Sequence, residues 1–343
     1  MTTDGTIRPA RPSIVPGAGR TVLVTGAAGV MGSRLVRGLV DAGWSVRALV
    51  LPGDPLRARL AGLGCEIREG DVSVRDSLHG ACDGVDTVFH LAAVIISADP
   101  TVFERVNRQG TANLVAAAAA ARIRHFIYVS SASVTYPRRT LYAESKLQAE
   151  HLVAGEAAFQ HTIIRPTLVY DETGGQEFVM FLDYLRRFPL VPFIGDGRAI
   201  KRPVFAGDIV DGLLRLAGSD VSFGKTYNFS GGEPISMADL AHLMLRHHAA
   251  DRPFVHLPVW LCRLVAWAMS LVLDRPPLTS SAIAGIVNDA DLDPTQATRE
   301  IGYQPLGVRE GFARCFPVVS PEAAPQTIRG GQVQPLAQEG NWR

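Results

Sequence analysis

Cysteine is scarce in this chain, which contains four in 343 residues. Cys65, Cys82, Cys262 and Cys315 are scattered, with no Cys-x-x-Cys pair and no histidine at metal-ligand spacing. This pattern argues against a disulfide scaffold and against a zinc module. It predicts reduced, mostly buried thiols in a cytoplasmic protein that has no metal site.

Blocks of one charge are absent as well. The 34 basic residues balance 33 acidic ones, and a net charge of +1 without a basic block gives no indication of a nucleic-acid partner. No apolar run is long enough to make a convincing membrane span, which needs about 20 residues. Residues 255–273 come nearest, but His256, Pro258 and Arg263 interrupt them. They predict a helix that lines an apolar pocket or lies on a membrane surface, with a core or dimer-interface helix as the alternative.

The two ends of the chain differ in composition from the rest. Residues 1–19 contain three prolines and no apolar core, so they are not a secretory signal and predict a disordered leader. Residues 317–343, rich in Pro, Gln and Gly, predict a disordered tail. We expect neither end to carry chemistry.

Between the ends, short β-branched runs alternate with amphipathic or alanine-rich stretches. Continuous apolar strands between helices predict an α/β fold with a parallel sheet covered on both faces. We expect this domain over residues 20–170, with a returning strand near 226–229. A smaller, interleaved C-terminal substrate lobe is expected over residues 171–316. The expected strands are 21–25, 45–50, 87–91, 126–130 and 162–165, and the clearest helices are 32–42 and 111–122.

The first of these strands runs into a glycine-rich segment, TGAAGVMG at residues 25–32. Glycines let the backbone turn tightly and approach a pyrophosphate, which is held at the positive end of the following helix. The G-x-x-G-x-x-G spacing differs from the commonest fingerprint, but the flanking strand and helix favour a dinucleotide site over a simple turn. The sequence therefore predicts a Rossmann-type doubly wound sheet. The residues expected at the cofactor are Gly26, Gly29, Val30, Met31 and Gly32.

Tyr142 and Lys146 lie four residues apart in the segment YAESK, and so share one face of a predicted helix. Removal of a hydride from a secondary alcohol requires the hydroxyl proton to leave as well. A phenol with a pKa of about 10 is a poor base at neutral pH, and a nearby ammonium and the oxidised nicotinamide are expected to lower that pKa. We therefore predict Tyr142 as the catalytic acid and base, with Lys146 also holding the nicotinamide ribose.

Hydroxyl side chains end the strand that precedes this helix. Ser131 is predicted to bind and orient the substrate oxygen beside Tyr142, and Ser133 is a second candidate for that role. Ser130, Ser131 and Ser133 could also be simple caps of the strand end.

In their order along residues 20–316, these segments resemble the extended branch of the short-chain dehydrogenase/reductase superfamily, the NAD-dependent epimerases and dehydratases. The resemblance implies that Asp71 and Val72 hold the adenine. It further implies that the strand end FHLAA at 89–93 lies against the adenosine and ribose, and that the segment at 164–166 reaches the cofactor. The residues so implied are Leu91, Ala92, Ala93 and Pro166.

The choice between NAD and NADP depends on the residue that closes the second strand, an acid for NAD and an arginine for NADP. Leu51 stands there, and Asp54 or Arg57 in the next loop could reach the ribose instead or be solvated loop charges. NAD is preferred because no arginine occupies the position of the 2′-phosphate, and NADP is the alternative.

Two substrate classes compete. Arg202, six residues before Asp208, resembles the arginine with which nucleotide-sugar epimerases grip a diphosphate, unless it only ties its loop to the second lobe. Dehydration is disfavoured because Ala132 and Ser133 stand where dehydratases have an acidic pair. Segments 130–134, 256–260 and 302–306 resemble 3β-hydroxysteroid and sterol-4-carboxylate 3-dehydrogenases more closely.

The sequence thus predicts an NAD(P)-dependent enzyme that oxidises a lipophilic, sterol-like alcohol or reduces its ketone. A 4-carboxyl group beside the new ketone would make a β-keto acid, whose decarboxylation needs no further residue. The alternatives are a nucleotide-sugar epimerase and a non-catalytic dinucleotide-binding regulator, the latter disfavoured by the intact Ser131, Tyr142 and Lys146.

Overall fold

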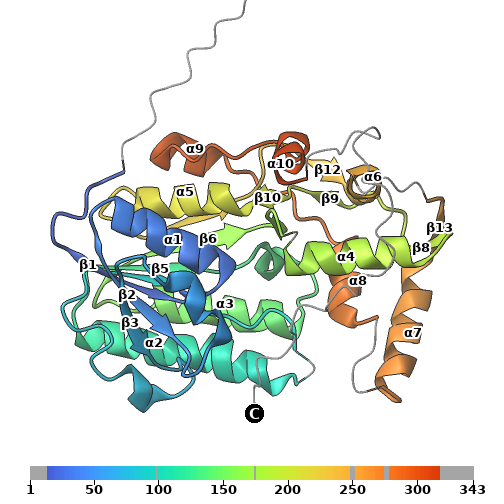
Figure 1. The fold of residues 1–343 in the computed structure, drawn as a ribbon. Coiled ribbons are helices and arrows are strands. Elements are labelled where there is room, and N and C mark those ends of the chain that lie inside the picture. The colour runs from blue at the N-terminus through green and yellow to red at the C-terminus, as the bar shows by residue number, and fades with distance from the viewer. Residues whose placement is uncertain (1–13, 98, 174, 248–251, 274–277, 317–343) are drawn as a thin grey trace, which may run out of the picture.

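A parallel sheet of seven strands forms the centre of the computed structural model, which describes residues 14–97, 99–173, 175–247, 252–273 and 278–316 (Figure 1). Its strand order is β11-β6-β5-β4-β1-β2-β3, and this confirms the predicted doubly wound α/β fold. The strand predicted near 226–229 is β11, which pairs in parallel with β6. The strands are β1 Thr21–Thr25, β2 Ser45–Val50, β3 Glu66–Glu69, β4 Thr87–His90, β5 His125–Val129, β6 Gln160–Pro166 and β11 Lys225–Phe229.

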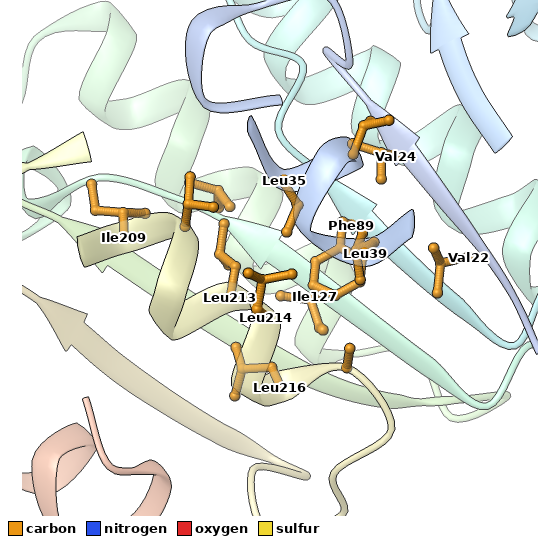
Figure 2. Packing of buried hydrophobic residues seen from close by; sticks show 14 of the residues in the cluster. Val22, Val24, Leu35, Leu39, Phe89, Ile127, Ile209, Leu213, Leu214 and Leu216 are labelled. Atoms are coloured by element: carbon orange, nitrogen blue, oxygen red, sulfur yellow. The ribbon is translucent and has the colours of Figure 1, made fainter. Parts of the chain in front are cut away.

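Helices cover both faces of this sheet. On one face lie α1 (Val30–Asp41) and α5 (Ala206–Leu216), and on the other lie α2 (Gly110–Ala120) and α3 (Leu141–Ala154) (Figure 1). Side chains alternate along a strand, so Val22 and Val24 of β1 join the first layer while Leu23 joins the second. Figure 2 shows the first layer, in which leucines of α1 and α5 pack over the sheet; it includes Leu35, Leu39, Phe89, Ile127, Leu213 and Leu214.

A smaller lobe continues from the end of β6 and has a hydrophobic cluster of its own around Tyr170, Phe178 and Phe312. The lobe is interleaved with the sheet, because α5 and β11 return to the sheet between its segments and α9 (Thr295–Ile301) packs beside them. Its helices are α4 Gln176–Arg187, α6 Met237–His247, α7 Val259–Ser270, α8 Ser280–Val287 and α10 Val308–Cys315. Its strand pairs are β7 Val169–Tyr170 with β10 Val204–Phe205, β9 Ile200–Lys201 with β12 Ile235–Ser236, and β8 Val191–Ile194 with β13 Phe254–Leu257.

The expected leader boundary at residue 19 needs a correction. Residues 14–19 belong to the packed domain: the Trp44 indole donates to the carbonyl of Val15 at 3.2 Å, and the Gly17 amide donates to Ala42 at 3.0 Å. These bonds use main-chain groups of the segment, which composition does not reveal. Residues 1–13 and 317–343, the rest of the predicted leader and the predicted tail, lie outside the described residues.

A buried histidine connects the ends of β1 and β4 to the helices on the second face. His90 Nδ1 lies 2.7 Å from Thr25 Oγ1, and its Nε2 lies 3.0 Å from Thr111 Oγ1. Thr111 donates to the Asn107 carbonyl at 2.5 Å, and the Ala92 amide donates to Thr25 Oγ1 at 3.2 Å. Each hydroxyl supplies one proton. A neutral His90 therefore accepts from Thr25 at Nδ1 and donates to Thr111 from Nε2, which continues a chain of hydrogen bonds from the Ala92 amide to the Asn107 carbonyl.

This chain of hydrogen bonds through His90 makes the stability of the fold depend on pH. Burial, assisted by the charge of Lys146, lowers the pKa of His90 to about 3. Between pH 6.5 and about 3 the unfolded chain therefore binds a proton that the folded chain does not. The contribution of His90 to the free energy of unfolding is complete above pH 6.5. It falls on acidification through that window by up to about 1.4 kcal/mol per pH unit.

We predict that His90→Gln flattens this part of the pH dependence. The measurement is urea unfolding of both proteins from pH 7 to pH 5, compared by the change in the free energy of unfolding. Equal changes in the two proteins would contradict the prediction.

Candidate active site

The glycine-rich turn after β1 combines two kinds of glycine. Gly26 has φ +66°, and a Cβ there would lie 2.9 Å from the Ala92 nitrogen. A Cβ at Gly32 would lie 2.1 Å from the Gly26 carbonyl oxygen, so both positions serve close packing inside the protein. At Gly29 a Cβ would meet only that same oxygen, at 3.2 Å. Gly29 thus leaves the approach to the first amides of α1 open.

The start of α1 fits a dinucleotide pyrophosphate. Gly29 is its N-cap without a side-chain hydrogen bond, and no acidic residue lies in the first turn. The first amides, beginning with those of Val30 and Met31, are therefore available to an anion, at the positive end of the helix dipole.

The other predicted cofactor residues lie where neighbouring strands end. Asp71 and Val72 follow β3, and Asn113 of α2 donates to the Val72 carbonyl at 2.9 Å. Pro166 is the last residue of β6, and the segment Leu91, Ala92 and Ala93 follows β4. Parallel strands end at one common edge, so these residues share the edge of the glycine turn. The turn itself stands between β4 and β2, where the strand order reverses.

The two residues that could reach the adenosine ribose in place of Leu51 both lie in the loop after β2. Leu51 itself directly follows the strand and is half-buried. Asp54 accepts from the Leu56 amide at 2.8 Å and caps a short helix, while Arg57 pairs with Glu69 at 2.5 Å. Asp54 is thus engaged within the loop, and Arg57 with the end of β3. Arg59, which sequence reasoning did not single out, donates to the Ala28 carbonyl at 3.3 Å and places a positive charge beside the glycine turn.

Tyr142 and Lys146 lie in the first half of α3, whose N-cap Thr140 accepts from the Ala143 amide at 3.2 Å. The Lys146 side chain is only 2% exposed. Its Nζ donates to the Val129 carbonyl at 2.7 Å and lies 4.3 Å from the centre of the Tyr128 ring. Lys146 therefore fixes the catalytic face of α3 against the end of β5.

The charges around Tyr142 differ from the expectation. Burial and then the charge of Glu177 raise the pKa of Tyr142 above its ordinary value, while interaction with the Ser131 side chain lowers it. Burial lowers the pKa of Lys146 to about 7, and Glu150 opposes this shift. The pKa of Tyr142 is thus raised by the surrounding protein. Its lowering by Lys146 together with the oxidised nicotinamide stays a prediction for the complex with the cofactor.

Ser131 combines the two roles considered for it. It is the N-cap of the short helix Ala132–Thr135, because its hydroxyl accepts from the Ser133 amide at 3.2 Å. The hydroxyls of Ser131 and Ser133 lie 2.9 Å apart. Ser131 is therefore a cap that also acts on Tyr142, and Ser133 stands directly beside it.

Two supporting residues were given no role in the site by sequence reasoning. Glu150, four residues after Lys146, is buried. Its carboxylate accepts hydrogen bonds from Nε and from a terminal nitrogen of Arg165, at 2.9 and 2.6 Å. The continued i, i+4 spacing of Tyr142, Lys146 and Glu150 was a signal for this pair. The Asn107 side-chain nitrogen donates to the Val94 carbonyl at 2.9 Å and to Ser145 Oγ at 3.1 Å, which connects the strand-end loop to α3.

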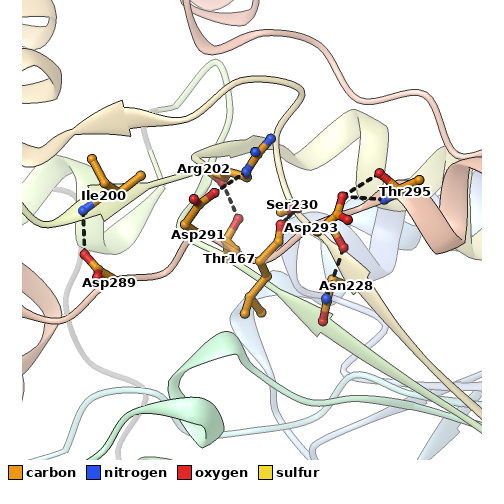
Figure 3. A network of polar contacts seen from close by, with 10 residues as sticks. Thr167, Ile200, Arg202, Asn228, Ser230, Asp289, Asp291, Asp293 and Thr295 are labelled. Carbon is orange, nitrogen blue, oxygen red and sulfur yellow. Dashed lines mark hydrogen bonds and ion pairs between the residues drawn. The ribbon is translucent and has the colours of Figure 1, made fainter.

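Arg202 belongs to a network of polar contacts with the segment at residues 289–293 (Figure 3). Its guanidinium pairs with Asp291, and its carbonyl accepts from the Thr167 hydroxyl. Nearby, Asp289 accepts from the Ile200 amide at 2.7 Å. Arg202 therefore joins its loop to the segment at residues 289–293, and its contact with a substrate stays a prediction.

Comparison with known proteins identifies the family of the chain. The model of the NAD dependent epimerase/dehydratase family matches residues 22–229. A 4-hydroxy-2-methyl-3-oxo-4-farnesyl-3,4-dihydroquinoline-1-oxide ketoreductase from Stigmatella aurantiaca is 27% identical over 307 residues, covering 82% of this chain and 90% of that protein. A 3 beta-hydroxysteroid dehydrogenase/Delta 5→4-isomerase from Mycobacterium tuberculosis is 26% identical over 338 residues, covering 86% and 89%.

Among solved structures, the dTDP-glucose 4,6-dehydratase DesIV from Streptomyces venezuelae, with NAD and TYD bound, superposes with a TM-score of 0.67. At 23% identity it covers 86% of this chain and 95% of its own, and it shows the shared fold. The predicted resemblance to the extended short-chain dehydrogenases is confirmed, and the relatives include 3β-hydroxysteroid dehydrogenases. The chain belongs to the NAD-dependent epimerase/dehydratase family of enzymes.

Proposed function

We propose that this protein is an NAD-dependent oxidoreductase that interconverts a secondary alcohol and a ketone on a lipophilic, sterol-like substrate, as 3β-hydroxysteroid dehydrogenases do. The observation that carries the proposal is the position of Tyr142 on α3. It interacts with Ser131 at the strand edge that also bears the glycine turn. NAD, when bound, supplies the hydride acceptor, and its positive nicotinamide supplies the charge that favours the phenolate.

Residues of this chain would transfer the proton, orient the substrate and hold the cofactor. The Tyr142 oxygen takes the hydroxyl proton during oxidation and returns it during reduction. Ser131 orients the substrate oxygen. Lys146 is held on the Val129 carbonyl, and its ammonium would hold the nicotinamide ribose when the cofactor is bound. Gly26, Gly29 and Gly32 shape the turn that would hold the pyrophosphate.

The smaller lobe supports a lipophilic substrate. A cavity of about 490 Å³ lies between β8, β13 and α8 and is lined mainly by apolar side chains, among them Ile194, Leu257 and Val287. Neighbouring α7 carries large apolar groups that are exposed: Trp260 is 68% and Trp267 61% accessible, and Leu271, which follows the helix, is 67% accessible.

We further propose that α7 lies on a membrane surface from which the substrate is drawn. Of its twelve residues, Cys262 and Ala266 are buried, so α7 is not a core helix of this chain. No helix in the described ranges has the length and apolarity to cross a membrane. Tryptophan favours the interface between lipid and water, which suits an apolar face with two of them.

The alternatives receive less support. For a nucleotide-sugar epimerase, Arg202 would have to pair with the nucleotide diphosphate, but it forms an ion pair with Asp291. A non-catalytic dinucleotide sensor would not need Tyr142, Lys146 and Ser131 together.

Tyr142→Phe is predicted to reduce kcat by about 10² to 10⁴-fold while leaving NAD affinity nearly unchanged, because only the proton-transfer oxygen is lost. The assay is NADH formation across a panel of sterols, other lipophilic alcohols and nucleotide sugars. Tyr227→Phe is the matched control, since its hydroxyl bonds to Glu300 and not to this site. A Tyr142→Phe enzyme that keeps more than about a tenth of wild-type kcat would contradict the assignment.

Gly29→Val should fold and weaken NAD binding by more than about tenfold, because the branched side chain stands in the path of the pyrophosphate. Gly32→Val should instead destabilise the protein, since its Cβ would overlap the Gly26 carbonyl. Calorimetric NAD titration and thermal unfolding distinguish the two effects. Normal NAD affinity in a folded Gly29→Val protein would exclude the phosphate-turn assignment.

Trp267→Glu is predicted to fold normally and to lose co-sedimentation with zwitterionic lipid vesicles, because it places a charge on the exposed apolar face of α7. Ser270→Glu adds the same charge on that helix without removing an apolar group and serves as the control. If Trp267→Glu left vesicle binding unchanged and dissociated a dimer in light scattering, the face would be a subunit interface instead.

A further inference from the structure

The ring of Tyr128 lies against the side chain of Lys146. Tyr128 is in β5 and is fully buried, and Lys146 in α3 is only 2% exposed. The Lys146 Nζ lies over the Tyr128 ring, 4.3 Å from its centre. An ammonium within about 6 Å of a ring centre, over the face of the ring, is attracted by the negative potential of that face. The geometry is therefore that of a cation–π contact enclosed within the protein.

Hydrogen bonds supply only part of the stabilisation that a buried Lys146 ammonium requires. An ammonium has three N–H donors, and in the described chain the Lys146 Nζ donates to the Val129 carbonyl, at 2.7 Å. No carboxylate of the described residues forms an ion pair with it, since Glu150, one turn later on α3, pairs with Arg165. A charge taken from water without such partners favours its neutral form. The Tyr128 ring is a further contact that favours the charged form.

Lys146 itself changes charge near neutral pH, while the groups beside it do not. Burial lowers the pKa of Lys146 to about 7. Burial also lowers the pKa of His90, whose ring centre is 5.6 Å from that of Tyr128, to about 3, so His90 is neutral. Burial raises the pKa of Tyr128 and of Tyr142, so both are neutral phenols at that pH in the free protein. Loss of one stabilising contact would therefore convert much of Lys146 to the neutral amine.

We propose that Tyr128 is a positioning residue that holds Lys146 in its charged form through the face of its ring. The inference rests on the proposed function, in which that ammonium would hold the nicotinamide ribose. A carboxylate in place of the ring would take up N–H groups of the lysine, whereas a ring attracts the charge as a whole. The ammonium thus keeps donors for the cofactor while its charge is stabilised.

The protonation of Lys146 can be measured directly. The chain contains only three lysines, Lys146, Lys201 and Lys225, so NMR of protein labelled with carbon-13 at lysine Cε follows each of them. Lys146→Arg identifies the Lys146 signal by its loss. In a titration from about pH 5 to about pH 10, Tyr128→Phe should keep the wild-type midpoint of Lys146, because the ring face remains. Tyr128→Leu should lower the midpoint by about one pH unit.

Phe126→Leu is the matched control for packing. Phe126 is fully buried on the same strand and in the same hydrophobic layer as Tyr128, so its replacement also removes a ring from the core. It should leave the Lys146 midpoint unchanged. A trifluorinated phenylalanine at position 128 avoids the cavity that leucine leaves, because it keeps the shape of the ring. Fluorine withdraws electron density from the ring face, so the midpoint should fall below that of Tyr128→Phe.

Calorimetric NAD titration gives a second measurement. As the pH rises, NAD affinity should begin to fall at a lower pH in the leucine and fluorinated variants than in Tyr128→Phe. A Lys146 midpoint that is unchanged in both variants would overturn the inference and leave the proposed function in place. A shifted midpoint in a protein that oxidises no alcohol of the substrate panel would support the role of the ring and contradict the proposed function.

Discussion

The candidate active site depends on one buried side chain, that of Lys146. Lys146 is almost fully enclosed, and its hydrogen bond to the Val129 carbonyl replaces part of the hydration that the charge has lost. Removing such a group from water costs several kcal/mol unless polar partners compensate, so its position is narrowly defined. Because Lys146 is on α3 and Val129 ends β5, this bond sets the height of Tyr142 above the sheet edge. The Glu150–Arg165 pair fixes the same helix to β6.

Much of this arrangement could be predicted from sequence because local pattern and tertiary environment agree. The bounds of β1 and β2 were predicted to the residue, since short, mostly apolar runs between helical segments are typical of the strands of a parallel sheet. The four-residue spacing of Tyr142 and Lys146 predicted that both side chains lie on one face of a helix. β3 was missed because Glu66, Arg68 and Glu69 make this edge strand polar, so no apolar run marks it.

Other features could not be predicted because they arise from distant contacts. Burial and then the charge of Glu177 raise the pKa of Tyr142. Glu177 lies 35 residues away in the smaller lobe, so the sequence near Tyr142 contains no sign of its effect. Arg202 could not be assigned from its motif, since its partner Asp291 comes from a later segment. The Ser131 cap likewise requires the backbone geometry of the turn that follows.

The interleaving of the smaller lobe with the sheet has a consequence for how this protein can change. The chain enters the lobe after β6, returns to the sheet for α5 and β11, and then enters the lobe again. An autonomous substrate module could be replaced by a single genetic exchange, but this lobe has no continuous gene segment of its own. New substrate preference must therefore accumulate by substitutions at individual positions in the existing lobe, each compatible with a sheet that its flanking segments help to build.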